Sequence, residues 1–233
     1  MSALQLIVFD IAGTTVRDKG DVANAFMTAF RDFALEIPAE EVKKVMGFRK
    51  MDAIRILLDK FYPEKAGAAD AGNLVEQIHS LFIQNMIGFY QGDEELEPLP
   101  HAEETFSFLR DLGLKVALNT GFTRAITDTI LHRLGWDHGN DLLDRVICSD
   151  EVPQGRPYPD MIATLIKEFG ILSPAYVLKV GDTEVDVEEG RNAGCGIVVS
   201  VTTGAYTRAQ LEQYHPDHII DDLRELIPII KKG

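Results

Sequence analysis

Residues 4–15, with the sequence LQLIVFDIAGTT, decide the fold class of this chain. Residues 4–9 form a short apolar run that ends at Asp10, and Gly13 follows three residues later. A run of this kind, closed by a tight glycine turn, is typical of a buried parallel strand. We therefore expect the first strand of a parallel sheet at residues 4–9, with Asp10 at its carboxyl end.

The chain after residue 97 alternates between short apolar runs and amphipathic stretches. We predict strands at 115–118, 145–148, 176–180 and 196–201, separated by helices at 102–112, 123–134, 157–169 and 185–193. Strands that alternate with helices indicate βαβ units and a parallel sheet with helices on both faces. The predicted fold class is therefore a doubly wound α/β core, Rossmann-like, with five strands.

Residues 21–91 differ in character, because they show helical periodicity and no convincing strand. The helices that we predict there cover 22–35, 38–45, 51–61 and 73–90. A helical block inserted after the first strand favours an α-helical cap, with hinges at 16–20 and 91–100. We predict a core of residues 1–15 and 98–233, and a cap with its hinges at 16–97.

Composition narrows the class of partner. The chain has 233 residues, 45% of them hydrophobic, and a formal net charge of -14. Such an acidic surface repels nucleic acids and anionic lipids, so we expect neither a nucleic-acid nor a membrane partner. The two cysteines, Cys148 and Cys195, support no disulfide framework or zinc site, and no export signal or membrane span is readable. We expect a cytoplasmic protein that binds a small molecule.

Carboxylates follow two of the predicted strands. In doubly wound folds, ligands bind at the carboxyl ends of strands. Asp10 follows the first strand, Thr120 and Gly121 follow the second, and Asp182 follows the strand at 176–180, with Asp186 one turn later. Aspartate attacks phosphorus only when the charges are neutralised together, and Mg²⁺ prefers such oxygen ligands. We therefore predict Mg²⁺ between Asp10 and Asp182.

A phosphate site is predicted at the same edge. Backbone N–H groups around Gly13 and Thr14 would form an anion nest, and Thr120 with Gly121 would add a hydroxyl and further N–H donors. Arg156 would supply a fixed positive charge. Each of these residues, taken by itself, has an ordinary explanation such as a helix cap or a turn. The acidic run 186–189, which includes Asp186, would by itself suggest a solvated helix face. Only the combination favours the phosphate site.

These residues resemble the motifs of the haloacid dehalogenase (HAD) superfamily of phosphotransferases. The resemblance covers the whole core and makes Asp10 the nucleophile, Thr120 the hydroxyl motif, Arg156 the basic motif, and Asp182 with Asp186 the acidic motif. Most superfamily phosphatases carry a second aspartate two residues after the nucleophile, where this chain has Ala12. An alkoxide leaving group needs a proton donor, so alanine there argues against ordinary phosphate ester hydrolysis.

The phosphonoacetaldehyde hydrolase (phosphonatase) branch, which cleaves a carbon–phosphorus bond, also has DxAGTT. Residues 120–124, 150–159 and 179–194 resemble that branch closely. The resemblance implies that the Ala12 carbonyl binds the metal, and that Lys50, in the context Met46-Gly47-Phe48-Arg49-Lys50, forms an imine with the substrate. Lys50 lies near a predicted helix start, and both the helix dipole and Arg49 would lower its pKa. Taken alone, Lys50 reads as a solvated surface lysine.

The chain departs from this branch around the leaving group. Ala53 stands in place of a cap histidine, we align Asp21 with a cysteine, and Phe122 replaces a tyrosine. Two alternatives therefore stay open: a phosphatase that acts on small phosphate monoesters, and a non-catalytic phosphate-binding protein. The resemblance also implies a homodimer formed through the cap.

Overall fold

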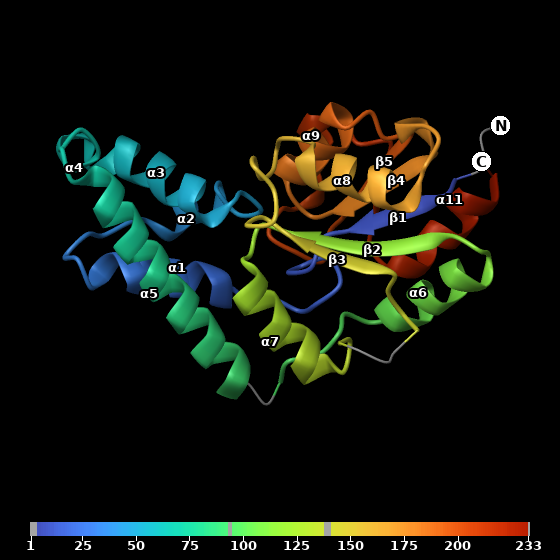
Figure 1. The fold of residues 1–233 in the computed structure, drawn as a ribbon, viewed down its shortest axis with the longest axis horizontal. Coiled ribbons are helices and arrows are strands. Elements are labelled where there is room, and N and C mark those ends of the chain that lie inside the picture. Colours follow the sequence, from blue (N-terminus) through green and yellow to red (C-terminus); the bar gives the residue numbers. More distant parts are fainter. Residues whose placement is uncertain (1–3, 93–94, 138–140, 233) are drawn as a thin grey trace.

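A parallel sheet of six strands forms the centre of the molecule (Figure 1). The computed structural model describes residues 4–92, 95–137 and 141–232. Within them the strand order is β3-β2-β1-β4-β5-β6, and every pair is parallel. The chain winds outward from β1 in both directions, which confirms the predicted doubly wound core.

The strands are short, and the five that we predicted are present. They are β1 (Leu6–Phe9), β2 (Lys115–Thr120), β3 (Arg145–Cys148), β4 (Val177–Gly181) and β5 (Ile197–Val201). The sixth, β6 (His218–Ile220), escaped prediction. It has three residues at the sheet edge and only Ile220 is buried, so it carries no apolar run for a sequence pattern to reveal.

Helices cover both faces of the sheet (Figure 1). One face carries α6 (Ala102–Asp111), α7 (Arg124–Leu134) and α11 (Leu226–Lys232), and the other carries α8 (Asp160–Phe169) and α9 (Glu184–Asn192). Side chains alternate along β1, so that Leu6 and Val8 join one buried cluster while Ile7 and Phe9 join the other. Short helical turns complete the core at α10 (Arg208–Leu211), Pro174–Tyr176, Glu212–Tyr214 and Leu223–Glu225.

The segment after β1 is helical, as predicted, and we call residues 21–92 the cap. It consists of α1 (Asp21–Arg31), α2 (Ala39–Lys43), α3 (Lys50–Phe61), α4 (Pro63–Ala66) and α5 (Ala71–Gly92). Its two connections to the core are joined to each other, because the Leu99 N–H donates to the Thr15 carbonyl at 2.8 Å. The boundaries at 15/16 and 97/98 stay a prediction, and the predicted hinge 91–100 includes residues 93–94, which lie outside the described residues.

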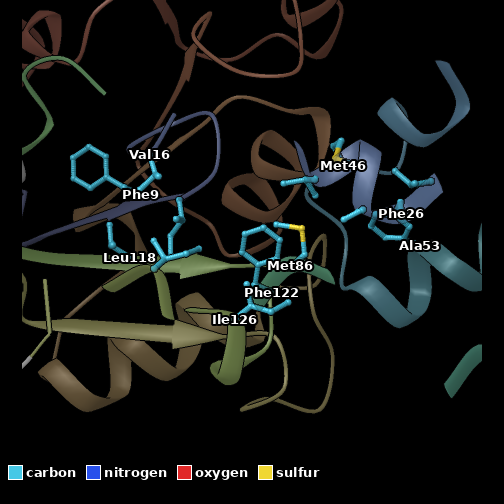
Figure 2. Packing of buried hydrophobic residues seen from close by; sticks show 14 of the residues in the cluster. Phe9, Val16, Phe26, Met46, Ala53, Met86, Leu118, Phe122 and Ile126 are labelled. Atoms are coloured by element: carbon cyan, nitrogen blue, oxygen red, sulfur yellow. The ribbon is translucent and has the colours of Figure 1, made fainter. Parts of the chain in front are cut away.

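Cap and core share one hydrophobic cluster. Figure 2 shows Met86 of α5 beside Phe122 and Ile126, which belong to the core side of that cluster. The Tyr90 ring on α5 also meets the Phe122 ring edge-on, with 6.3 Å between centroids. Throughout the described residues, every helix is too short or too polar to span a lipid bilayer.

Substitution of Phe82 tests the packing between helices α1 and α5 of the cap. It is fully buried on α5, and its ring centroid lies 4.5 Å from that of Phe26 on α1. We expect Phe82→Ala to lower the free energy of unfolding by about 3–5 kcal/mol in urea denaturation, because it leaves a cavity between two helices. Leu172→Ala is the control, since Leu172 is 83% exposed. Equal losses in both variants would contradict this packing.

Candidate active site

Two carboxylates emerge side by side from the centre of the sheet. Strands β1 and β4 pair in parallel with Phe9 opposite Val180, so Asp10 and Asp182 leave adjacent strands at the same edge. Adjacent strands lie about 4.8 Å apart. Both side chains are buried, with 5% of Asp10 and 3% of Asp182 exposed. The structure therefore brings together the two residues that the sequence assigned to one metal.

A cavity of about 30 Å³ lies over these carboxylates, between core and cap. This volume holds a water molecule or two but no larger ligand. Its walls contain most of the predicted site residues and a few others: Asp10, Ala12, Asp18, Met46, Lys50, Thr120, Gly121, Phe122, Arg156 and Asp182. The cap residues Met46 and Lys50 thus face the core residues that we predicted to bind phosphate and metal.

The cap is closed onto the core at backbone level. A Cβ atom on Gly121 would lie 2.5 Å from the Phe48 carbonyl oxygen. One on Gly47, which has φ +83°, would lie 2.4 Å from Cγ2 of Val185 in the core. No side chain fits at either position, because backbone and side-chain atoms already occupy the space. A ligand larger than the cavity therefore enters only when the cap moves away.

Burial makes the two carboxylates costly to ionise together. Burial raises the pKa of Asp10, although Arg156, whose Nη2 lies 2.5 Å from Oδ1, partly offsets the effect. Burial raises the pKa of Asp182 further, and the negative charges of Asp10 and Asp186 add to this. Asp182 accepts hydrogen bonds from the Ala205 N–H at 2.7 Å and the Thr14 hydroxyl at 3.2 Å. Such a pair gains from a shared cation.

The donor set fits a hard cation. Within the described residues, no cluster of three or more His, Cys, Asp or Glu side chains is placed to hold a metal. A third protein ligand would therefore be a carbonyl, and Ala12 lines the same cavity as Asp10 and Asp182. Two carboxylates and a carbonyl are the all-oxygen ligands that Mg²⁺ accepts, with water or substrate oxygens completing its shell.

Arg156 is held beneath the cavity rather than on a surface. Its side chain is fully buried, and its guanidinium pairs with both Asp10 and Asp186. Burial opposes the charge on Asp186, yet Arg156 and Lys179 lower its pKa to about 2. The guanidinium thus fixes the orientation of Asp10, and a direct contact with phosphate stays a prediction.

Sequence reasoning missed the buried network that supports Arg156. Lys179 on β4 is fully buried, and its Nζ lies 2.6 Å from Oδ1 of Asn119, 3.0 Å from Asp186 and 3.2 Å from Glu189. The solvated helix face predicted for 186–189 is wrong, because Asp186 and Glu189 are 1% and 0% exposed. The available signal was a lysine inside an apolar strand, since a buried charge requires partners.

The turn after β1 differs from the predicted phosphate nest. The N–H of Gly13 donates to the Val16 carbonyl at 2.8 Å, and the N–H of Thr14 donates to the Ile11 carbonyl at 3.2 Å. These donors close the turn itself and do not stand ready for an anion. Gly13, with φ +86°, instead brings the backbone against Asp182, because a Cβ there would lie 2.8 Å from Oδ2. Gly13 and Thr14 therefore position Asp182.

Lys50 is buried in the wall of the cavity, so the surface interpretation is wrong. Only 4% of it is exposed, and its Nζ lies 5.2 Å from the Phe122 ring centroid and 5.6 Å from that of Phe26. Burial, and then Arg156, lower its pKa to about 8 against the opposing pull of Asp10, Asp18 and Asp182. Arg49 points elsewhere, because its guanidinium donates to the Pro153 carbonyl at 3.0 Å.

The three departures from the phosphonatase pattern occupy different places. Phe122 lines the cavity, whereas Ala53 is fully buried in the packing of the cap. Asp21, which we aligned with a cysteine near the leaving group, is not among the lining residues, but Asp18 is. Sequence reasoning missed Asp18, because a polar residue in a hinge has no pattern of its own.

Comparisons with known proteins identify the family of this chain. A sequence model described as haloacid dehalogenase-like hydrolase matches residues 4–194. A protein of Bordetella pertussis named phosphonoacetaldehyde hydrolase is 34% identical over 218 residues, which cover 91% of this chain and 77% of the relative. A protein of the same name from Bacillus cereus is 29% identical over 242 residues, with 98% and 87% covered.

Solved structures show the same fold. A phosphonoacetaldehyde hydrolase-like protein from Oleispira antarctica superposes with a TM-score of 0.82 at 23% identity, covering 99% of this chain and 92% of that one. A predicted phosphoglycolate phosphatase from Haemophilus somnus gives 0.76 at 24% identity, covering 98% and 99%. The motif residues, their placement at the strand ends and these matches lead to one conclusion: the chain belongs to the haloacid dehalogenase-like hydrolases, in the branch that resembles phosphonoacetaldehyde hydrolase.

Proposed function

We propose that this hydrolase cleaves the carbon–phosphorus bond of phosphonoacetaldehyde or a related carbonyl phosphonate. The observation that carries the proposal is the buried amine of Lys50 in the wall of the same cavity as Asp10. A protonated lysine beside the nucleophile would suit any phosphoryl transfer, but a buried amine with a lowered pKa has a further use with a carbonyl substrate. A phosphonate next to a carbonyl needs such an amine, because carbon leaves phosphorus only when its electrons have an acceptor.

Each residue has a defined task in this reaction. The Lys50 nitrogen bonds to the carbonyl carbon, and loss of water leaves an iminium. Asp10 then attacks phosphorus, and the electrons of the broken carbon–phosphorus bond move into the iminium as an enamine. Water cleaves the aspartyl phosphate, and protonation and hydrolysis of the enamine release the carbonyl product. Mg²⁺ held by Asp10, Asp182 and the Ala12 carbonyl would neutralise the phosphonate charge.

The polar groups of the core restrain Asp10 for this attack. Arg156 holds one carboxylate oxygen of Asp10, and the other is available to phosphorus. The Thr120 hydroxyl accepts the Phe122 N–H at 3.1 Å, which leaves its own proton for a phosphonate oxygen. Closure of the cap excludes bulk water while the phosphoryl group moves.

Two rival functions have weaker support. Phosphate monoester hydrolysis would need a proton donor for the leaving oxygen, and Ala12 supplies no side-chain proton. A non-catalytic phosphate-binding protein would not need Asp10 to be oriented by a buried arginine. We also propose, on resemblance alone, a homodimer and a cytoplasmic location.

Substrate preference and imine trapping test the proposal together. We expect turnover of phosphonoacetaldehyde to exceed that of p-nitrophenyl phosphate by at least about 100-fold in kcat/KM. Borohydride added during turnover is expected to leave a reduced adduct on Lys50, detected by peptide mass. Lys50→Met removes the amine while keeping an apolar stem. We expect this variant to lose both the turnover of phosphonoacetaldehyde and the reduced adduct.

The matched control is Lys60→Met, because Lys60 lies on the same helix but is half exposed. Turnover of the phosphonate without any trapped adduct would contradict the imine. Faster hydrolysis of the monoester would favour the phosphatase.

The pH profile tests the Lys50 amine independently. Burial and Arg156 lower the pKa of Lys50 to about 8, and only the neutral amine attacks a carbonyl. We expect kcat/KM for the phosphonate to rise about tenfold per pH unit below that value and to level off above it. A profile that stays flat from about pH 6 upward would show that deprotonation of this amine does not limit the reaction.

A further inference from the structure

Asp18 is a carboxylate in the cavity to which neither the sequence motifs nor the proposed chemistry assigns a task. It lies on the connection between β1 and the cap, and it lines the cavity together with Lys50. Its Oδ1 accepts the N–H groups of Gly20 at 2.9 Å and Asp21 at 2.8 Å, which fixes the side chain at the start of α1. Asp18 is partly buried, and in the described part of the chain no protein group donates to its Oδ2.

Lys50 needs a group that moves protons. An ammonium must lose a proton before it attacks a carbonyl, and the carbonyl oxygen must gain protons before it leaves as water. The charged groups that act most strongly on Lys50 are Arg156, Asp10, Asp18 and Asp182. The two aromatic rings against Lys50, those of Phe26 and Phe122, carry no titratable group.

Two of the three carboxylates are already engaged. Asp10 pairs with Arg156 and is needed as the nucleophile, and both oxygens of Asp182 accept hydrogen bonds, from Thr14 and from Ala205. Asp10 and Asp18 each keep one oxygen without a hydrogen-bond partner in the described residues, and the proposed reaction already uses that oxygen of Asp10 to attack phosphorus, which leaves Asp18. Among the described residues, Asp18 and Lys50 line the same cavity without forming an ion pair within 4.0 Å, so a proton would pass between them through a water molecule, for which the cavity has room.

We propose that Asp18 is the proton carrier for Lys50, acting as general base and then general acid in imine formation. This inference rests on the proposed carbonyl phosphonate chemistry and adds a residue to it. Its position on the hinge has a consequence, since Asp18 and Lys50 share a cavity only while the cap is closed. Imine formation would then be fastest in the closed enzyme.

The steps balance. Asp18 takes one proton from the Lys50 ammonium, and the freed nitrogen pair forms the bond to the carbonyl carbon. A proton moves from nitrogen to the former carbonyl oxygen, which gives a carbinolamine. Asp18 returns its proton to that hydroxyl group, the carbon–oxygen bond breaks with loss of water, and the nitrogen pair forms the iminium. Asp18 ends as the carboxylate with which it began.

Asp18→Asn separates this role from simple electrostatics. Asparagine keeps the oxygen that accepts the Gly20 and Asp21 N–H groups, so α1 keeps its N-terminal support. The Asp18 charge raises the pKa of Lys50, so its loss alone would give more free amine and faster trapping. Loss of a proton carrier gives the opposite sign. The variant is mixed with phosphonoacetaldehyde, and borohydride stops the reaction at set times in a rapid-quench instrument. We expect the rate at which the adduct on Lys50 appears to fall by at least about 100-fold.

The control is Asp21→Asn, which removes an equal charge three residues away, at the start of α1 and outside the cavity lining, and is expected to trap within about twofold of wild type. Circular dichroism and thermal melting verify folding, and Asp18→Ser, which also keeps an acceptor, provides a second variant. Trapping at or above the wild-type rate in Asp18→Asn and Asp18→Ser would overturn the inference. Turnover by wild type without any adduct would overturn the proposed function, and this inference with it.

Discussion

The burial of two carboxylates at adjacent strand ends is the constraint on which the rest of the site depends. Asp10 and Asp182 follow β1 and β4, and the register of that pair leaves them no way to separate. Burial raises the pKa of both, the charge of Asp186 adds to the effect at both, and the charge of Asp10 adds to it at Asp182. Arg156 supplies positive charge from within the chain, and in the proposed reaction a divalent cation bound by these oxygens would supply the rest.

The buried polar network explains why Arg156 can serve as a fixed charge. Lys179, Asp186 and Glu189 surround it with both signs of charge, and Asn119 donates to Glu189 at 2.8 Å. A buried charge without partners costs several kcal/mol, at least about 3 when one member of a pair is removed. The network therefore acts as a rigid base that carries Asp10, and its members lie on strand and helix rather than on loops.

In the proposed reaction the cap contributes the amine of Lys50. The packing that buries Lys50 also lowers its pKa, which favours the neutral amine that the reaction needs. The contacts of Gly47 and Gly121 show how tightly the cap loop fits the core. Cap and core share a hydrophobic cluster that includes Phe122, which meets Tyr90 of α5. Any opening of the cap therefore acts on the packing between α5 and the core.

Much of this arrangement was predictable from sequence, because apolar runs and strand-end motifs are local signals. Asp10 and Asp182 were found in this way, whereas Lys50 was indicated only by the resemblance to the phosphonatase branch. The roles of Gly13, Glu189 and Asp18 were not predictable, since each depends on contacts between residues far apart in the sequence. Gly13 brings the backbone against Asp182, Glu189 pairs with Lys179, and Asp18 lines the same cavity as Lys50 only because of how the cap folds onto the core.

The most direct test of the central claim is a crystal structure with Mg²⁺ and beryllofluoride, a mimic of an aspartyl phosphate. We expect the ion within about 2.1 Å of oxygens from Asp10, Asp182 and the Ala12 carbonyl, with beryllium on the second oxygen of Asp10. An ion that lacks Asp182 as a ligand, or beryllium bound to another residue, would contradict the account.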